Sequence, residues 1–126
     1  MTLDDGSGSA PVLAVLDYGI GNLRSAQKAL QKVGADARLT ADPEVVALAD
    51  GVVLPGVGAF GRCLEALGDT GLWSTARDTA STAATGTGRP FLGICVGLQM
   101  LHQGSAEAPG VPGLGVLPGE VTLLSG

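Results

Sequence analysis

The stretch from Pro90 to Gln99 constrains the fold more than any other part of this sequence. It opens with a short apolar run, Phe-Leu-Gly-Ile, that leads directly into Cys95. Gly93 and Gly97 stand two positions on either side of the cysteine, and a helical apolar pattern begins just after it. The spacing Gly-x-Cys-x-Gly is the cysteine counterpart of the Gly-x-Ser-x-Gly elbow, in which a buried strand turns sharply into a helix. It predicts a strained, exposed cysteine, with flanking glycines that let the strand and helix backbones approach closely.

An elbow cysteine is suited to nucleophilic chemistry, because the dipole and the free N–H groups of the following helix stabilise a thiolate. The alternative interpretation is a buried structural cysteine beside glycines that pack a helix against a strand. Short glycine motifs are common, so the spacing alone leaves both interpretations open. The remainder of the chain has to discriminate between them.

The first forty residues contain a β-α-β pattern. Residues 12–17 form a continuous apolar run, as expected for a parallel strand buried on both faces. A helix is predicted to follow Asn22, a plausible N-cap, and to end at Gly34. Residues 35–40 are predicted as a second strand, so the unit implies a right-handed crossover and a parallel sheet. The apolar face of the helix is predicted to consist of Leu23, Ala26, Leu30 and Val33.

Short helices and strands continue to alternate up to the elbow. Asp42 and Pro43 form a helix start, with proline at the first helical position. The apolar face of that helix is predicted to hold Val45, Val46, Leu48 and Ala49. The elements predicted after it are a strand at 51–54, a glycine-rich loop at 55–61, a helix through Cys63 to Leu67, a helix at about 72–84, a strand at 91–94 and a helix at about 96–102.

The two ends of the chain are less regular. Residues 1–10 are polar and acidic, and we expect a disordered lead-in there, followed by one domain over residues 11–126. Residues 104–115 are predicted as loop, and residues 116–124 as one strand or two short ones broken at Pro118. A doubly wound sheet rarely ends directly after a strand, so we expect this domain to be incomplete at its C-terminal end.

Composition excludes several classes of function. The net charge is −5 with only seven Lys and Arg, which argues against a nucleic-acid-binding protein, since such a protein needs a basic face. There is no apolar run long enough to cross a membrane and no secretory signal pattern at the start. Two cysteines do not make a disulfide framework, and reduced thiols in the cytoplasm are expected. No cluster of residues has metal-ligand spacing, so we predict no metal.

Three loops should meet at the carboxyl edge of the sheet, where open parallel sheets form their sites. They are Asp17 to Asn22, residues 55–61 and the Cys95 elbow. Acyl transfer needs N–H donors for the developing oxyanion. We expect one donor from Val96 and another from Gly56, Val57 or Gly58. The alternative for residues 55–61 is an ordinary βα turn. Asp17 could be functional or could cap a turn.

A nucleophilic cysteine also needs a base, normally histidine. The only histidine is His102, seven residues after Cys95 on the same predicted helix. Seven residues span about 10 Å along a helix axis, and an elbow side chain points away from the helix that follows it. His102 is therefore a poor base and is predicted to be a helix-end residue. Cys63 has helical spacing with Leu64 and Leu67 and is predicted to be a packing residue.

Four stretches of the chain resemble one known family. They are residues 17–25, 54–61, 93–99 and 113–119. Together they resemble the class I, triad-type glutamine amidotransferases, and most closely the glutaminase subunits of imidazole glycerol phosphate synthase. The resemblance implies an α/β fold of three layers, with a mostly parallel, flavodoxin-like sheet flanked by helices. It covers about residues 12–124.

The resemblance also implies roles for individual residues. Cys95 would attack the side-chain amide of glutamine, form a glutamyl thioester and release ammonia. Residues 55–58 would be the oxyanion loop, and Gln99 would help to hold the substrate glutamine. No cofactor is implied. The single acidic residue of the 104–108 stretch, where relatives often have two, predicts weaker binding of the α-amino group of glutamine or simply a different loop.

A partner protein is implied as well. In this family the ammonia passes to a cyclase subunit, a (βα)₈ barrel, that makes imidazole glycerol phosphate in histidine biosynthesis. The loop after the first strand would face that partner, with Tyr18, Gly19 and Asn22 as interface residues.

The chain departs from the family in one important respect. The family's catalytic His and Glu lie well downstream, in a protein of roughly 200 residues, a usual size for one α/β domain. We therefore expect these 126 residues alone to be inactive. Two alternatives remain open. One is another triad amidotransferase, such as the pyridoxal phosphate synthase glutaminase, and the other is a non-catalytic module that binds the cyclase.

Overall fold

The computed structural model describes residues 10–124. The expected lead-in at 1–10 lies outside the described residues except for its last position. The elements are β1 (Val12–Leu16), α1 (Leu23–Lys32), β2 (Asp36–Thr40), α2 (Pro43–Leu48), β3 (Gly51–Gly56), α3 (Phe60–Asp69), α4 (Trp73–Ala84), β4 (Phe91–Cys95), α5 (Val96–Met100), β5 (Gly104–Ser105) and β6 (Glu120–Val121).

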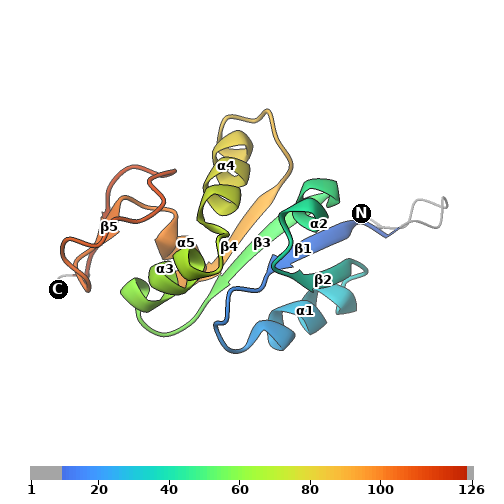
Figure 1. Ribbon diagram of the computed structural model, residues 1–126, viewed down its shortest axis with the longest axis horizontal. Coiled ribbons are helices and arrows are strands. Elements are labelled where there is room, and N and C mark those ends of the chain that lie inside the picture. Colours follow the sequence, from blue (N-terminus) through green and yellow to red (C-terminus); the bar gives the residue numbers. More distant parts are fainter. Residues whose placement is uncertain (1–9, 125–126) are drawn as a thin grey trace.

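The central sheet has four strands in the order β2-β1-β3-β4, and every neighbouring pair is parallel (Figure 1). This confirms the predicted α/β fold with a parallel sheet flanked by helices. The short parallel pair β5–β6 lies apart from this sheet, at the opposite end of the molecule from β2 (Figure 1).

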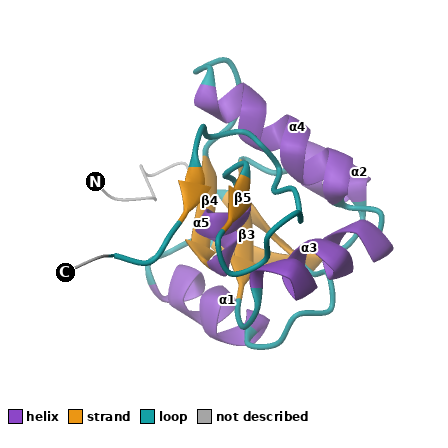
Figure 2. Cartoon of the chain, turned by 90° about the vertical axis from the view of Figure 1, so that its left-hand side faces the viewer, coloured by secondary structure: helices purple, strands orange, loops and turns teal. Residues whose placement is uncertain are grey.

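The helices cover the two faces of the sheet unequally. On one face, α2, α3 and α4 pack over apolar side chains of β1 and β3, which include Leu16 and Leu54, both fully buried. On the other face, Leu30 of α1 packs against a smaller cluster built on Val15 and Val53. Figure 2 shows α2, α3 and α4 together on one side of the strands, with α1 on the other. The larger core therefore lies under α3, next to the elbow.

The start of α2 agrees with its prediction, whereas the start of α1 does not. The Asp42 carboxylate accepts a hydrogen bond of 2.9 Å from the N–H of Glu44, as an N-cap should. Asn22 occupies the N-cap position of α1, but its φ of 68° is left-handed and its side chain makes no capping bond. A capping side chain requires an extended backbone at that position, so the prediction of a side-chain cap at Asn22 was wrong.

Two predicted apolar faces also need correction. Val33 is 66 % exposed and Leu48 is 85 % exposed. Val33 follows the last helical residue of α1, Lys32, and Leu48 is itself the last residue of α2, so both side chains leave the sheet where the helices end. Both residues have the spacing of an apolar helix face, but spacing alone does not show which residues near a helix end reach the core.

The segment after the elbow differs most from its prediction. Helix α5 ends at Met100 rather than at His102, and the strand expected within residues 116–124 is reduced to β6. The N–H groups of Leu114 and Leu117 bond the carbonyls of Met100 and Leu101 at 2.8 and 2.9 Å. A returning loop thus satisfies the end of α5. The N–H group of Leu117, which a strand over residues 116–124 could have used for pairing, is bonded to the end of α5 instead. Residues 104–115, predicted as loop throughout, begin with the short strand β5.

Within residues 10–124, no helix combines the length and apolar character needed to cross a membrane.

Candidate active site

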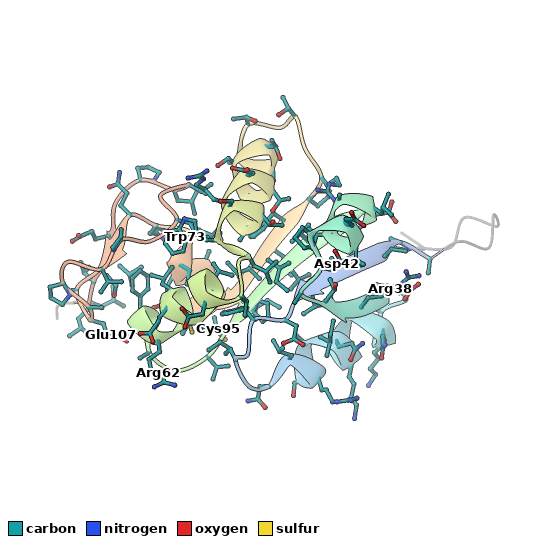
Figure 3. All side chains as sticks on the ribbon, in the orientation of Figure 1. Arg38, Asp42, Arg62, Trp73, Cys95 and Glu107 are labelled. Carbon is teal, nitrogen blue, oxygen red and sulfur yellow. The ribbon has the colours of Figure 1, made fainter. Side chains whose placement is uncertain are left out.

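Cys95 lies at the junction of β4 and α5, as the elbow motif predicts. It is the last residue of β4 and the N-cap of α5, with φ 55° and ψ −122°. Apart from glycines, only Cys95 and Asn22 have positive φ among the described residues. The side chain of Cys95 is exposed, and Figure 3 shows it beside the ribbon of α3. Because Cys95 is exposed, the alternative of a buried structural cysteine does not hold.

Three glycines permit this junction. A Cβ on Gly93 would lie 2.8 Å from the Cα of Leu98, and one on Gly56 would lie 2.6 Å from the backbone nitrogen of Gly97. A Cβ on Gly97 would overlap the carbonyl oxygen of Leu54. The backbones of β3, β4 and α5 therefore approach too closely for any larger residue. This is the physical reason for the two glycines that flank Cys95 and for Gly56 in the neighbouring strand.

The glycine-rich loop lies directly beside the cysteine. In the pairing of β3 with β4, Gly56 is opposite Cys95, and β3 continues to Gly56 instead of ending at Leu54 as predicted. After it, Val57 and Gly58 are exposed, and Gly58 has a φ of 88°. The structure thus brings together the two segments that the sequence analysis assigned to one site.

Side chains from three separate segments of the chain hold this loop. The Tyr18 hydroxyl donates to the carbonyl of Pro55. The thiol of Cys63, in α3, donates to the carbonyl of Val57 at 3.4 Å. The Glu107 carboxylate accepts the N–H of Phe60 at 2.9 Å and so caps α3, which has no side-chain cap of its own (Figure 3). The sequence analysis assigned none of these three contacts. A side chain that bonds a main-chain carbonyl or N–H outside its own helix or strand leaves no periodic signal in the sequence.

Tyr18 was expected to face a partner, but its side chain is buried and only 1 % exposed. Burial raises its pKa well above the ordinary value, and the neighbouring Cys63 thiol raises it further. The expectation of an interface role for this side chain was therefore wrong, because the core next to β3 takes it up. Gly19 and Asn22 on the same loop are exposed. Asp17 accepts the N–H of Gly19 at 3.4 Å, which favours the turn-capping interpretation of that residue.

The other predicted site residues lie near the elbow. Val96 is the first residue of α5, so its N–H has no partner within the helix. Gln99 lines a cleft of about 430 Å³ together with Ser105 and Glu107. His102 is half-buried, and its Nδ1 lies 3.3 Å from the carbonyl oxygen of Gln99. It lies two residues beyond the end of α5 and turns back onto that helix.

Cys63 is fully buried in the core, which confirms its predicted packing role. Among residues 10–124, no three His, Cys, Asp or Glu side chains are grouped in a way that could hold a metal ion.

Curated relatives identify the family. The chain is 49% identical over 110 residues to the imidazole glycerol phosphate synthase subunit HisH of Methanothermobacter thermautotrophicus, a match that covers 87% of this chain and 52% of the relative. The HisH subunits of Bacillus cereus and Synechococcus elongatus are 42% and 48% identical over 113 residues, which covers 90% of this chain and 52% and 49% of theirs. This chain belongs to the HisH family. No family model matches it.

The chain spans about half the length of the HisH relatives it matches. A solved structure described as a glutamine amidotransferase superposes with a TM-score of 0.64 and 24% sequence identity, over 83% of this chain and 52% of that one. At this level of identity the structural match supports the fold. The HisH membership rests on the sequence matches.

Proposed function

We propose that the protein to which this chain belongs is a glutaminase that releases ammonia from glutamine, with Cys95 as its nucleophile. The observation that carries this proposal is the elbow itself. A cysteine held at φ 55° and ψ −122° lies opposite Gly56, at the start of a loop rich in exposed main chain. Such an arrangement supplies a nucleophile and N–H donors within one small region, which are the two requirements of acyl transfer.

The proposed reaction proceeds in two steps. The Cys95 thiolate adds to the amide carbon of glutamine, and the carbonyl oxygen becomes an oxyanion that N–H groups of Val96 and of the Gly56–Gly58 loop stabilise. The carbon–nitrogen bond then breaks, the amide nitrogen leaves as ammonia after taking up the proton lost by the thiol, and a thioester remains. Water cleaves the thioester, releasing glutamate and regenerating the thiol.

The cleft beside Gln99 is the proposed substrate site. Besides Gln99, its wall includes Ser105 and Glu107, so it presents polar groups of the kind that orient a small polar substrate. The Glu107 carboxylate already accepts the N–H of Phe60, which reduces its capacity for the α-amino group of glutamine. This geometry supports the expectation of weaker binding at that end of the substrate.

The proposed partner is the cyclase subunit that receives the ammonia in histidine biosynthesis, in the cytoplasm. The candidate interface residues are Gly19 and Asn22, because they are exposed and follow β1 at the carboxyl edge of the sheet. Cys95 ends β4 at the same edge, since all four strands are parallel. A partner on this edge would therefore lie on the side of the sheet from which ammonia leaves.

We assign no general base for Cys95 within residues 10–124. His102, the only histidine of the chain, turns back onto Gln99. We therefore expect residues 1–126 in isolation to release no glutamate from glutamine. A measurable glutaminase rate from this chain alone would contradict that expectation.

A chloroketone analogue of glutamine tests the proposal, with the modified cysteine identified by peptide mass mapping. Selective alkylation of Cys95 over Cys63, faster when the cyclase subunit is added, would support the glutaminase. Iodoacetamide, which does not resemble glutamine, is the reagent control, and Cys95→Ser is the protein control. Slow labelling of Cys95 at equal rates by both reagents, unaffected by the cyclase, would favour a non-catalytic cyclase-binding module.

A further inference from the structure

The loop between β3 and α3 is held from behind by a small buried cluster of Tyr18, Cys63 and Met100. Tyr18 is 1 % exposed, and the other two side chains are fully buried. The Tyr18 hydroxyl contacts the Pro55 carbonyl and also lies 3.6 Å from the Met100 sulfur. The cluster therefore joins the end of β1, the helix α3 and the end of α5 beneath one loop.

The Tyr18 hydroxyl supplies a hydrogen bond to β3 beyond the point where its pairing with β1 ends. The ladder between β1 and β3 pairs residues 13–15 with residues 51–53 and goes no further. Tyr18 comes two residues after the end of β1, and its hydroxyl reaches Pro55, two residues beyond that ladder. Without it, the carbonyl of the buried residue Pro55 would lose a hydrogen bond, which costs free energy because water does not readily replace the partner of a buried group.

The Tyr18–Pro55 and Cys63–Val57 hydrogen bonds each orient one main-chain N–H group. A peptide bond is planar and trans, so the carbonyl of one residue and the N–H of the next point in opposite directions. The Tyr18 contact on the Pro55 carbonyl therefore sets the direction of the Gly56 N–H. The Cys63 contact on the Val57 carbonyl, at 3.4 Å, sets that of the Gly58 N–H in the same way. Gly56 ends β3 opposite Cys95, and Gly58 lies in the loop that follows.

We propose that Tyr18 and Cys63 are positioning residues that aim main-chain N–H donors of the Gly56–Gly58 loop at the reacting carbonyl oxygen. The inference deepens the proposed glutaminase function and rests on it. Neither side chain touches the substrate, since both are buried behind the loop. Their hydroxyl and thiol act through the peptide planes that they hold.

Tyr18→Phe in the intact protein is the main test, because it removes one oxygen and keeps the ring. Loss of one hydrogen bond is expected to slow alkylation of Cys95 by the glutamine chloroketone by about five- to tenfold. Alkylation by iodoacetamide, which needs no oxyanion donors, should stay within about twofold of the wild-type rate. Hydrogen exchange of the Gly56 and Gly58 amides should accelerate at the same time.

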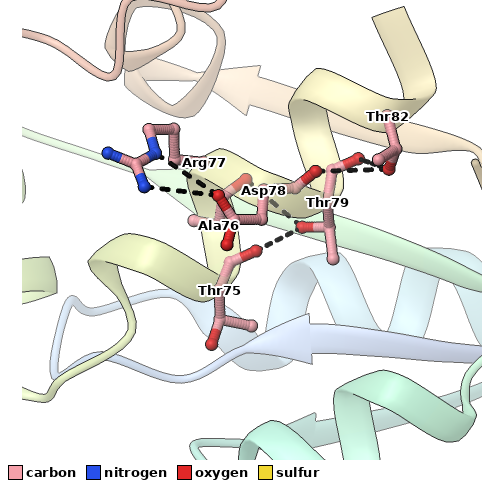
Figure 4. Close-up of polar contacts among 6 residues, drawn as sticks. All are labelled: Thr75, Ala76, Arg77, Asp78, Thr79 and Thr82. Carbon is pink, nitrogen blue, oxygen red and sulfur yellow. Dashed lines mark hydrogen bonds and ion pairs between the residues drawn. The ribbon is translucent and has the colours of Figure 1, made fainter. Parts of the chain in front are cut away.

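A matched control and a second pair of variants separate positioning from stability. The hydroxyl of Thr79 in α4 bonds the carbonyls of Thr75 and Ala76 at 2.6 and 3.2 Å, away from the site (Figure 4). Thr79→Ala therefore removes a hydroxyl–carbonyl bond without touching the loop, and its ratio of chloroketone to iodoacetamide rates should equal that of the wild type. Cys63→Ala should lower the ratio, whereas Cys63→Ser keeps a donor and should restore part of it.

The outcomes distinguish this inference from the function on which it rests. An unchanged ratio and unchanged loop exchange in Tyr18→Phe would overturn the positioning role, even if the melting temperature fell. A wild-type protein that reacts equally with both reagents would overturn the glutaminase proposal instead. The exchange of the Gly56 and Gly58 amides would then decide by itself whether Tyr18 orients the loop.

Discussion

Gly97→Ala is the substitution that tests the elbow most directly. The added methyl would overlap the Leu54 carbonyl oxygen and lie 2.9 Å from the carbonyl carbon of Leu54 and 3.2 Å from that of Pro55. Carbon atoms in contact prefer about 3.5–4.0 Å, so β3 and α5 would have to separate by roughly half an ångström or more. All the opposing atoms are backbone atoms, and no side chain can rotate away to relieve the overlap.

The free-energy cost follows from that geometry. Overpacking a core costs about 1–3 kcal/mol when side chains can adjust, and we place Gly97→Ala at about 3 kcal/mol because only backbone can yield. For a domain of this size, that loss corresponds to a melting temperature lower by about 10–15 °C. Thermal unfolding followed by far-ultraviolet circular dichroism measures it, and labelling of Cys95 by the glutamine chloroketone should fall with it.

Gly68→Ala is the matched control, because a Cβ there has no neighbour within 4 Å and the position lies inside α3. Alanine in place of a helical glycine stabilises by about 0.5–1 kcal/mol, so this variant should melt slightly higher than the wild type. If Gly97→Ala melted within a few degrees of Gly68→Ala, the close contact of α5 with β3 would not exist in solution. The account of the elbow glycines would then be wrong.

Three further predictions concern strain, capping and pH. Cys95→Gly should be more stable than Cys95→Ala by about 1 kcal/mol or more in urea unfolding, since glycine adopts φ 55° without strain; equal stability would refute the strain. Asp42→Ala should cost about 1 kcal/mol in the same assay by removing the bond to the Glu44 N–H, whereas Asn22→Gly should not destabilise, because Asn22 makes no such bond and glycine adopts its φ of 68° without strain. The raised pKa of Tyr18 means that its stabilisation is complete below the ordinary value of 10.0 and is lost as pH rises toward the folded value. Above pH 10.0 the wild type should therefore lose up to about 1.4 kcal/mol per pH unit relative to Tyr18→Phe, and parallel pH curves would contradict the burial of the phenol.

Strands β1, β3 and β4 were predictable because each contains a continuous apolar run between turn residues. Residues 12–17 and 91–94 agree with β1 and β4 to within one residue at either end. The end of the described chain was not predictable in this way. The apolar residues Val116 and Leu117 resemble a strand locally, but the Leu117 N–H bonds the carbonyl of Leu101, and the segment closes α5 instead. Local pattern cannot decide between two uses of the same main-chain groups.

The candidate site likewise has parts that the local sequence predicts and parts that it does not. The sequence alone located Cys95, because an elbow needs its glycines at fixed offsets from one residue, and this leaves a local signature. It also located the loop at 55–61 through its glycine content. The interface role of Tyr18 came from the family resemblance, and the structure buries its ring instead. The position of a loop residue after a strand does not show whether its ring turns outward or into the core.

What the sequence by itself determined is therefore the alternation of strands and helices, the cysteine at the strand–helix elbow and the glycine-rich loop beside it. These depend on interactions between residues close together in the chain. What only the tertiary structure decided is the support behind that loop, through Tyr18, Cys63 and Glu107, which act on residues 37, 6 and 47 positions away. Side chains that reach main-chain carbonyl and N–H groups across the fold depend on how the elements pack, and packing is settled only when the whole sheet and its helices assemble.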